Sequence, residues 1–161
     1  MSSPTGTDSA PVEWLSAAEM LAWRSYVETN ADLMAALERD LAPTGLNLGD
    51  YQVLVFLAES PERSLRMCDL AARLQLSPSG LTRRLDGLVR ANLVERRGSA
   101  SDRRVMLAAV TPKGVRALEQ SAPVHVASVR ERMIDLLDED ELRVLAEVFR
   151  KIRSRLEQDT G

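Results

Sequence analysis

Residues 75–92, QLSPSGLTRRLDGLVRAN, decide the fold of this chain because they have the pattern of a short helix with two different faces. Ser77 is a favourable N-cap, and Pro78 suits the first helical position, where a missing amide hydrogen costs nothing. Asn92 is suited to a left-handed helix end, with Leu93 as the apolar residue that packs behind it. At about 100° per residue, one face of this helix carries Leu81, Leu85, Leu88 and Val89.

The opposite face of the predicted helix is polar and carries Ser79, Thr82, Arg83, Asp86 and Arg90. An apolar back and a polar front with arginines and small hydroxyl groups are what a helix needs to contact base edges in a major groove. Taken alone, the same pattern also fits an ordinary surface helix whose polar face meets only water. The segments on either side therefore have to decide between the two interpretations.

The distribution of charge favours a negatively charged partner, although the 161 residues together carry a net charge of −3. Between Arg66 and Met106 there are nine arginines and four acidic residues, so this segment carries +5 and the rest of the chain −8. A basic middle between acidic ends is expected when one part of a protein faces phosphate. Arginine in particular suits phosphate and guanine, because its planar fork donates two parallel hydrogen bonds.

Composition predicts a globular protein of the cytoplasm without a membrane anchor. Apolar residues make up 45% and charged residues 28% of the chain, which is ordinary for a folded domain. No run approaches the roughly 18 apolar residues that span a bilayer. The single cysteine, Cys68, excludes an intrachain disulfide framework and fits a reducing compartment. Residues 1–11 lack the pattern of a secretory signal and are expected to be disordered.

The segments around the two-faced helix predict a helix-turn-helix followed by a β-hairpin. Two short helices joined by a tight turn form a helix-turn-helix, and a hydrophobic period of two beyond Asn92 predicts strands. A small polar loop with arginines separates these two strands. The predicted elements are a buried helix (48–59), one short strand (64–66), a short helix (67–74), the two-faced helix (75–92) and the two strands (93–97 and 104–110).

A long amphipathic helix is predicted at the N-terminal end of the chain. Ser16 and Glu19 form a capping box, which opens a helix that reaches about Leu41. Its length of roughly 35 Å, at 1.5 Å per residue, exceeds what a small core can cover. Its apolar stripe consists of Met20, Trp23, Val27, Met34, Leu37 and Leu41.

Two further helices are predicted at the C-terminal end. Thr111 and Pro112 begin the first of them, and Pro123 must kink or break it because its ring removes one hydrogen bond. Asp138 and Glu141 form a second capping box at the start of the last helix. Apolar residues of this helix alternate at three and four positions, as in the seam of a helix pair; they are Leu142, Leu145, Phe149, Ile152 and Leu156. Two such terminal stripes indicate a second subunit.

This order of elements makes a winged helix, and residues 48–118 resemble the MarR family of bacterial transcription regulators. The most specific likeness is Asp102-Arg103-Arg104 followed by a strand and by L-x-x-x-T-x-x-G at residues 107–114. The resemblance implies a mainly α fold with a small β-hairpin wing, flanked by long terminal dimerisation helices. It also implies a homodimer on palindromic double-stranded DNA, which commonly acts as a repressor and loses affinity when a small molecule or an oxidant binds.

The expected division of the chain follows from this likeness. It comprises a disordered tail (1–11), an N-terminal dimerisation helix (12–42), the winged helix-turn-helix domain (43–111), the C-terminal dimerisation helices (112–157) and a short tail (158–161). Asn92 replaces the glycine that is usual in the family, and the same left-handed turn is expected. The first helix lacks the reactive cysteine of oxidant-sensing members, and Cys68 is expected to be a plain structural, buried residue.

The likeness assigns roles to residues of the helix-turn-helix and the wing. Base edges are expected to be contacted by Ser77, Ser79, Thr82 and Arg83, and phosphates by Arg84 and Arg90. Arg97 lies beside the wing loop and joins the DNA-binding set. Arg104 is expected to enter the minor groove with Asp102 orienting it, while Arg103 touches the DNA backbone. The dimer seam is assigned to Leu142, Leu145, Phe149, Ile152 and Leu156.

Other kinds of site are weaker in this sequence. Trp23, Tyr26 and Tyr51 could line a ligand pocket, although aromatic residues at helical spacing more often belong to a core. His125 is the only histidine, so neither a metal site nor any cofactor is expected. No nucleophile–base pair or phosphate loop is present, which argues against an enzyme. The main alternative is a winged helix that binds another protein, whose recognition face should be apolar or acidic instead of basic.

Overall fold

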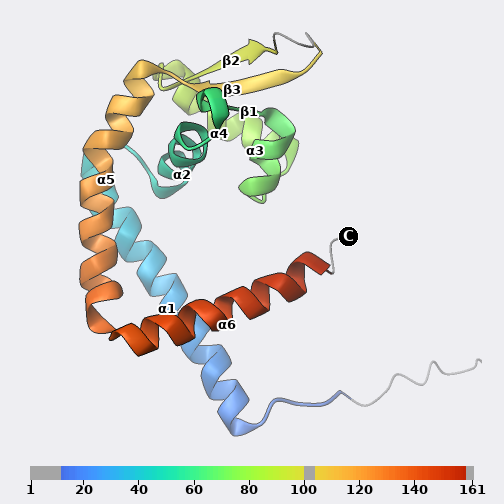
Figure 1. The fold of residues 1–161 in the computed structure, drawn as a ribbon, viewed down its shortest axis with the longest axis vertical. Coiled ribbons are helices and arrows are strands. Elements are labelled where there is room, and N and C mark those ends of the chain that lie inside the picture. The colour runs from blue at the N-terminus through green and yellow to red at the C-terminus, as the bar shows by residue number, and fades with distance from the viewer. Residues whose placement is uncertain (1–11, 100–103, 159–161) are drawn as a thin grey trace, which may run out of the picture. The chain divides into compact units, whose positions relative to one another are not determined.

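The computed structural model describes residues 12–99 and 104–158. Close contacts divide the chain into two units that meet between Met34 and Ala35, within helix α1 (Ala17–Leu41). The first unit contains the N-terminal part of α1, and the second contains all other helices and strands (Figure 1). The division at 12–42 and 43–111 proposed from the sequence stays a prediction.

The described residues of the second unit are mainly helical, with one small sheet. Three short 3₁₀ turns connect its elements, at Ala42–Thr44, Pro61–Arg63 and Ile134–Leu136. The helices are α2 (Leu48–Ala58), α3 (Met67–Arg73), α4 (Pro78–Arg90), α5 (Pro112–Arg132) and α6 (Glu139–Gln158). The strands are β1 (Ser64–Arg66), β2 (Val94–Gly98) and β3 (Met106–Val110).

The sheet has three antiparallel strands in the order β1-β3-β2. Strands β2 and β3 form the predicted hairpin, in which Arg96 lies opposite Ala108. The short strand β1 pairs with the other edge of β3, with Leu65 opposite Ala108. Helices α3 and α4 follow β1 directly and precede β2, so the helix-turn-helix connects two strands of the same sheet (Figure 1). The predicted fold, a winged helix-turn-helix with long terminal helices, is confirmed.

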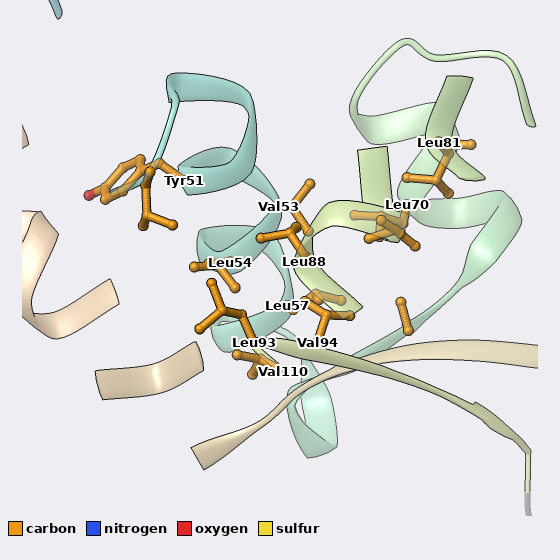
Figure 2. Close-up of a cluster of buried hydrophobic side chains, with 14 of the residues drawn as sticks. Tyr51, Val53, Leu54, Leu57, Leu70, Leu81, Leu88, Leu93, Val94 and Val110 are labelled. Atoms are coloured by element: carbon orange, nitrogen blue, oxygen red, sulfur yellow. The ribbon is translucent and has the colours of Figure 1, made fainter. Parts of the chain in front are cut away.

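One cluster of buried side chains connects the helix-turn-helix to the sheet. Helix α2 contributes Val53, Leu54 and Leu57, which are fully buried. Figure 2 shows these side chains directed toward residues from α3, α4, β2 and β3, among them Leu70, Leu81, Leu88, Val94 and Val110. The leucine face predicted for residues 75–92 is therefore the core face of α4. Its burial fixes the rotation of α4 about its own axis and turns the polar face outward.

The helix caps predicted from the sequence are confirmed by hydrogen bonds. The amide of Glu19 donates to the hydroxyl of Ser16, and the amide of Ser16 donates to the Glu19 carboxylate. The same reciprocal pair joins Asp138 and Glu141 at the start of α6. Single caps are formed at α2, α4 and α5, where the amides of Asp50, Gly80 and Gly114 donate to Asn47, Ser77 and Thr111.

One sequence expectation is narrowed and another needs correction. Helix α5 continues through Pro123, so of the two outcomes expected there, a kink or a break, the break does not occur. Cys68 is exposed on α3, and its Sγ lies 3.5 Å from Asp69 Oδ1. The expectation of a buried structural cysteine is therefore wrong; Cys68 falls on the outer side of α3, opposite the buried Leu70 and Ala71.

A polar cluster joins the end of α1 to the end of α5 within the second unit. Asp40 Oδ2 accepts hydrogen bonds from the hydroxyl of Ser128 at 2.6 Å and from Arg132 Nη2 at 2.8 Å. Ser128 is buried, and its hydroxyl donates to this carboxylate while it accepts from Arg132 Nε at 3.3 Å. The Ser128 hydroxyl, followed by Arg132, lowers the pKa of Asp40 below its ordinary value of 3.8.

Replacement of Asp40 by asparagine is expected to destabilise the protein at neutral pH and to matter little in acid. A carboxyl whose pKa is lower in the folded state adds stability above its unfolded pKa. That contribution disappears as the pH falls through the lowered pKa of the folded state. Urea unfolding of wild type and Asp40→Asn from pH 7 to acid pH should show the two stabilities converging, with Asp32→Asn on the same helix as control. A constant difference at all pH values contradicts the role assigned to this carboxylate.

Candidate nucleic-acid interface

Helix α4 presents an exposed polar face opposite its buried leucines. Ser79, Thr82, Arg83 and Arg90 are all exposed on this face. Ser77 uses its Oγ to accept from Gly80, and it lies 3.2 Å from Ser79 Oγ. The hydroxyl of Thr82 donates to the Pro78 carbonyl at 2.9 Å, which fixes its rotamer. The face therefore combines hydroxyl groups that are fixed by hydrogen bonds to the helix backbone with an exposed guanidinium. Such a set of groups suits both base edges and phosphates.

Left-handed residues mark both ends of α4. Gln75 has a φ of 53°, and Leu76 donates back to the Ala71 carbonyl, so the chain reverses tightly between α3 and α4. Asn92 has a φ of 59°, and Leu93 donates to the Leu88 carbonyl, as expected from the sequence. The tight turn at Gln75 and Leu76 was expected from the sequence, but the left-handed φ of Gln75 was not, because glutamine carries no preference for a left-handed backbone.

The wing is tied to the middle of α4 by Arg96 of β2. Its Nη2 donates to the Thr82 carbonyl at 3.0 Å and to Asp86 Oδ1 at 2.8 Å. These contacts fix the hairpin relative to the exposed face of α4. The sequence did not reveal Arg96, because its partners lie on another element.

The remaining wing residues differ in how far their positions are defined. Arg97 is exposed and lies 3.9 Å from Glu95, a distance typical of a weak surface pair. The amide of Ser99 donates to the Val105 carbonyl and closes the described part of the hairpin. Arg104 is exposed, whereas Asp102 and Arg103 lie outside the described residues. The roles of these arginines on DNA stay predictions.

Arg84 has partners within the protein that the sequence analysis did not assign. Its Nη1 donates to Asn47 Oδ1 at 3.0 Å and lies 3.6 Å from Asp50 Oδ1, at the start of α2. The side chain of Arg84 is 35% exposed, whereas Arg83 beside it lies on the exposed face. Two adjacent arginines of α4 therefore have different surroundings.

The start of α5 is packed closely beneath the end of α4. Lys113 Nζ donates to the Ala91 carbonyl at 2.8 Å, and the hydroxyl of Thr111 donates to the Asn92 carbonyl at the same distance. A Cβ on Gly114 would lie 2.1 Å from the Leu93 carbonyl oxygen, which is far too close for any atom. Only glycine therefore allows this approach, which fixes α5 to the C-terminal end of α4.

The three aromatic residues expected at a ligand site lie in two different units. Trp23 and Tyr26 are neighbours on α1, with ring centroids 6.1 Å apart, and both are exposed. Tyr51 is buried in the second unit, where its ring lies 4.6 Å from that of His125. Burial lowers the pKa of His125 and raises that of Tyr51. Among the described residues, His125 Nδ1 is a buried polar atom without a hydrogen-bond partner.

The apolar stripe of α6 is largely open to solvent in the single chain. Phe149, Ile152 and Leu156 are 42%, 50% and 61% exposed. Leu142 and Leu145 are half-buried. A stripe of large exposed apolar side chains along one helix is typical of a surface that another chain covers. Assignment of these residues to a dimer seam stays a prediction.

Residues 12–99 and 104–158 show neither a cluster of metal ligands nor a membrane-spanning helix. No group of three or more potential metal ligands occurs there. Within the same residues, no helix is both long and apolar enough to cross a membrane. The polar face of α4, its hydroxyl groups and the adjoining hairpin are thus the candidate functional surface.

The chain is similar to a known protein family. The family model described as MarR family matches residues 44–105, which run from the end of the first 3₁₀ turn into the wing. The transcriptional repressor YetL of Bacillus subtilis is 27% identical over 131 residues, which cover 80% of this chain and 78% of YetL.

Two solved structures from Streptomyces coelicolor are more similar. AbsC, a MarR family transcriptional regulator, has 40% sequence identity and a TM-score of 0.87, covering 91% of this chain and 99% of AbsC. Sco3205, a MarR family regulator solved in complex with DNA, has 36% identity and a TM-score of 0.86, covering 92% and 93%. With this identity over nearly the whole length, the chain belongs to the MarR family of transcriptional regulators.

Proposed function

We propose that this protein is a homodimeric, sequence-specific DNA-binding repressor whose affinity for its operator falls when a small molecule binds. The observation that carries the proposal is the exposed face of α4, which bears Arg83, Arg90 and held hydroxyl groups beside the wing. The complex of Sco3205 with DNA and the repressor activity in the name of YetL support it. The protein acts by binding and not by catalysis, in the cytoplasm where the genome lies.

Each part of the surface has a proposed role on the duplex. Ser77, Ser79, Thr82 and Arg83 contact base edges in the major groove, and Arg90 and Arg97 contact phosphates. Arg104 of the wing enters the minor groove. The roles that the sequence suggested for Asp102 and Arg103, which lie outside the described residues, stay predictions. Two copies of α4 related by a two-fold axis contact half-sites about 34–36 Å apart, so the operator is a palindrome.

Binding to duplex DNA is expected to weaken steeply with salt. Each neutralised phosphate releases counterions and contributes about −0.9 to the slope of log affinity against log salt concentration. Duplexes selected by the protein from a random-sequence library, titrated by fluorescence anisotropy at several KCl concentrations, measure this slope. Failure to select any duplex, or an affinity independent of salt, contradicts the proposed function and favours a protein partner instead.

Replacement of Arg83 by alanine is expected to relax sequence preference. A base-contacting arginine contributes about 1–3 kcal/mol of discrimination, so the ratio of affinities for a selected and a scrambled duplex should fall roughly 5- to 150-fold. Arg66→Ala removes an exposed arginine that precedes α3 and serves as the control. An equal loss of affinity for both duplexes would assign Arg83 to phosphate contact.

The proposed effector site lies around Tyr51 in the second unit. Trp23 and Tyr26 belong to the first unit, and the part that the sequence suggested for them stays a prediction. Tyr51 lies against His125, whose Nδ1 is the one buried polar side-chain atom without a partner among the described residues. An aromatic ligand would find ring partners and a polar group there. Thermal stabilisation of the wild type by a library of aromatic compounds, lost in Tyr51→Ala, tests this assignment.

A further inference from the structure

We propose that Arg84 is a positioning residue that sets the orientation of α4 through the first turn of α2, and that it does not contact DNA phosphate. The inference rests on the proposed DNA-binding function and changes the role that the sequence suggested for Arg84. It is carried by the contacts of the guanidinium, by the charges around it and by the glycine beneath it.

The guanidinium of Arg84 is held by the cap of α2. Asn47 Oδ1 accepts from both Arg84 Nη1 at 3.0 Å and the Asp50 amide at 2.8 Å. Asn47 Nδ2 donates to Asp50 Oδ2 at 2.7 Å, and Asp50 Oδ1 lies 3.6 Å from Arg84 Nη1. One arginine thus joins the cap residue and the third residue of α2 to the middle of α4. Both contacts are made by Nη1, at the tip of the guanidinium, so they depend on the full length of the arginine side chain.

The charges at this place are unfavourable for a DNA phosphate. Glu38 Oε2 accepts from the Leu48 amide at 2.8 Å, so carboxylates of Glu38 and Asp50 both lie at the start of α2. Glu38 occupies the Leu48 amide and Asn47 Oδ1 occupies the Asp50 amide, two groups that a helix start could otherwise offer to an anion. Burial raises the pKa of Asp50, and the neighbouring guanidinium acts in the opposite direction. The positive charge of Arg84 is therefore balanced inside the protein.

Gly49 makes room for the guanidinium on the surface of α2. A Cβ at this position would lie 2.2 Å from Arg84 Nη1 and 2.5 Å from Arg84 Cζ. Any residue other than glycine would displace the guanidinium from Asn47 and Asp50. The contact can therefore be disturbed from α2 without altering any side chain of α4.

The test compares variants on a duplex selected by the wild type and on a scrambled duplex of equal length. Arg84→Ala is expected to lower affinity for the selected duplex at least about tenfold, because the base-contacting face is misplaced. Its salt slope on the scrambled duplex should match the wild type. Arg90→Ala, the matched arginine on α4, should reduce that slope by about 0.9.

Gly49→Ala leaves every residue of α4 unchanged and is expected to lower affinity for the selected duplex to a similar extent. The double variant should bind no more weakly than Arg84→Ala, because both changes remove one contact. Arg84→Lys keeps a charge for phosphate, but its shorter side chain does not carry an ammonium group to the Nη1 position, so it too should lose preference for the selected duplex. Circular dichroism at the binding temperature tests whether each variant is folded. If Arg84→Ala is unfolded, Arg84→Lys decides whether Arg84 positions α4 or contacts phosphate.

Three results would overturn the assignment. One is a salt slope reduced in Arg84→Ala as it is in Arg90→Ala, with equal losses on both duplexes. Another is wild-type binding by Gly49→Ala, and the third is full selectivity in Arg84→Lys. If the wild type selects no duplex at all, the proposed function fails and the inference falls with it. That outcome is distinct, since the three others require normal binding by the wild type.

Discussion

Phe149→Asp is expected to dissociate the proposed dimer and to abolish DNA binding at concentrations where the wild type is saturated. Phe149 lies in the middle of the α6 stripe and is 42% exposed in the single chain. In a two-fold interface each substitution occurs twice, so two carboxylates lose water without gaining partners. We expect a loss of about 4 kcal/mol, which raises the dimer dissociation constant about a thousandfold.

Sedimentation velocity at micromolar concentration measures this dissociation, and the selected duplex reports on DNA binding. Ser154→Asp adds the same charge to an exposed position of α6 outside the stripe, so it should remain dimeric. A compact 17.8 kDa monomer in the wild type that binds a palindrome with full affinity refutes the proposed architecture. A dimeric Phe149→Asp variant would instead place the seam elsewhere.

Gly114→Ala is expected to be among the most destabilising single-methyl additions in the second unit. The added Cβ would lie 2.1 Å from the Leu93 carbonyl oxygen and 2.7 Å from Val110 Cγ2. That carbonyl cannot move freely, because it accepts from the Thr111 amide and hydroxyl. The start of α5 must therefore separate from the end of α4, at a cost of about 3 kcal/mol or more.

Urea unfolding with a fluorescence readout measures the loss, and Gly87→Ala is the matched control. Gly87 lies inside α4 with no atom near its Cβ position, so alanine there should stabilise the protein by about 0.5–1 kcal/mol. Equal stabilities of Gly114→Ala and the wild type would show that the close approach of α5 to α4 is absent in solution.

The fold was predictable because its signals are local. Ser77 and Pro78 define the start of α4, leucine spacing defines its buried face, and Asn92 defines its end. Each of these is a preference of a residue for its own backbone or its own helix face. The exposed face follows from the buried one, so the candidates Thr82 and Arg83 were available from the sequence as well.

The internal contacts of the site were not predictable, because their partners are remote. Arg84 meets Asn47 at a separation of 37 residues, and Arg96 meets Asp86 across two elements. No periodicity or spacing encodes such pairs, and an arginine on a polar face is indistinguishable from a phosphate contact until its neighbours are known. The exposure of Cys68 was not predictable for the same reason. In a short helix, the exposure of a single residue depends on which other elements pack against that helix.

The close junction of α5 with α4 makes α5 a lever. Lys113, Thr111 and Gly114 join one end of it to α4, so the helix-turn-helix turns with α5 as one body. The 21 residues of α5 extend about 30 Å at 1.5 Å per residue. If α5 tilts by about 5° about its C-terminal end, where Arg132 is bound to Asp40, its N-terminal end moves by about 2.5 Å. That displacement nearly equals the length of a hydrogen bond, so a slight change of angle between the two subunits of the proposed dimer would be enough to break all of the proposed base contacts at once.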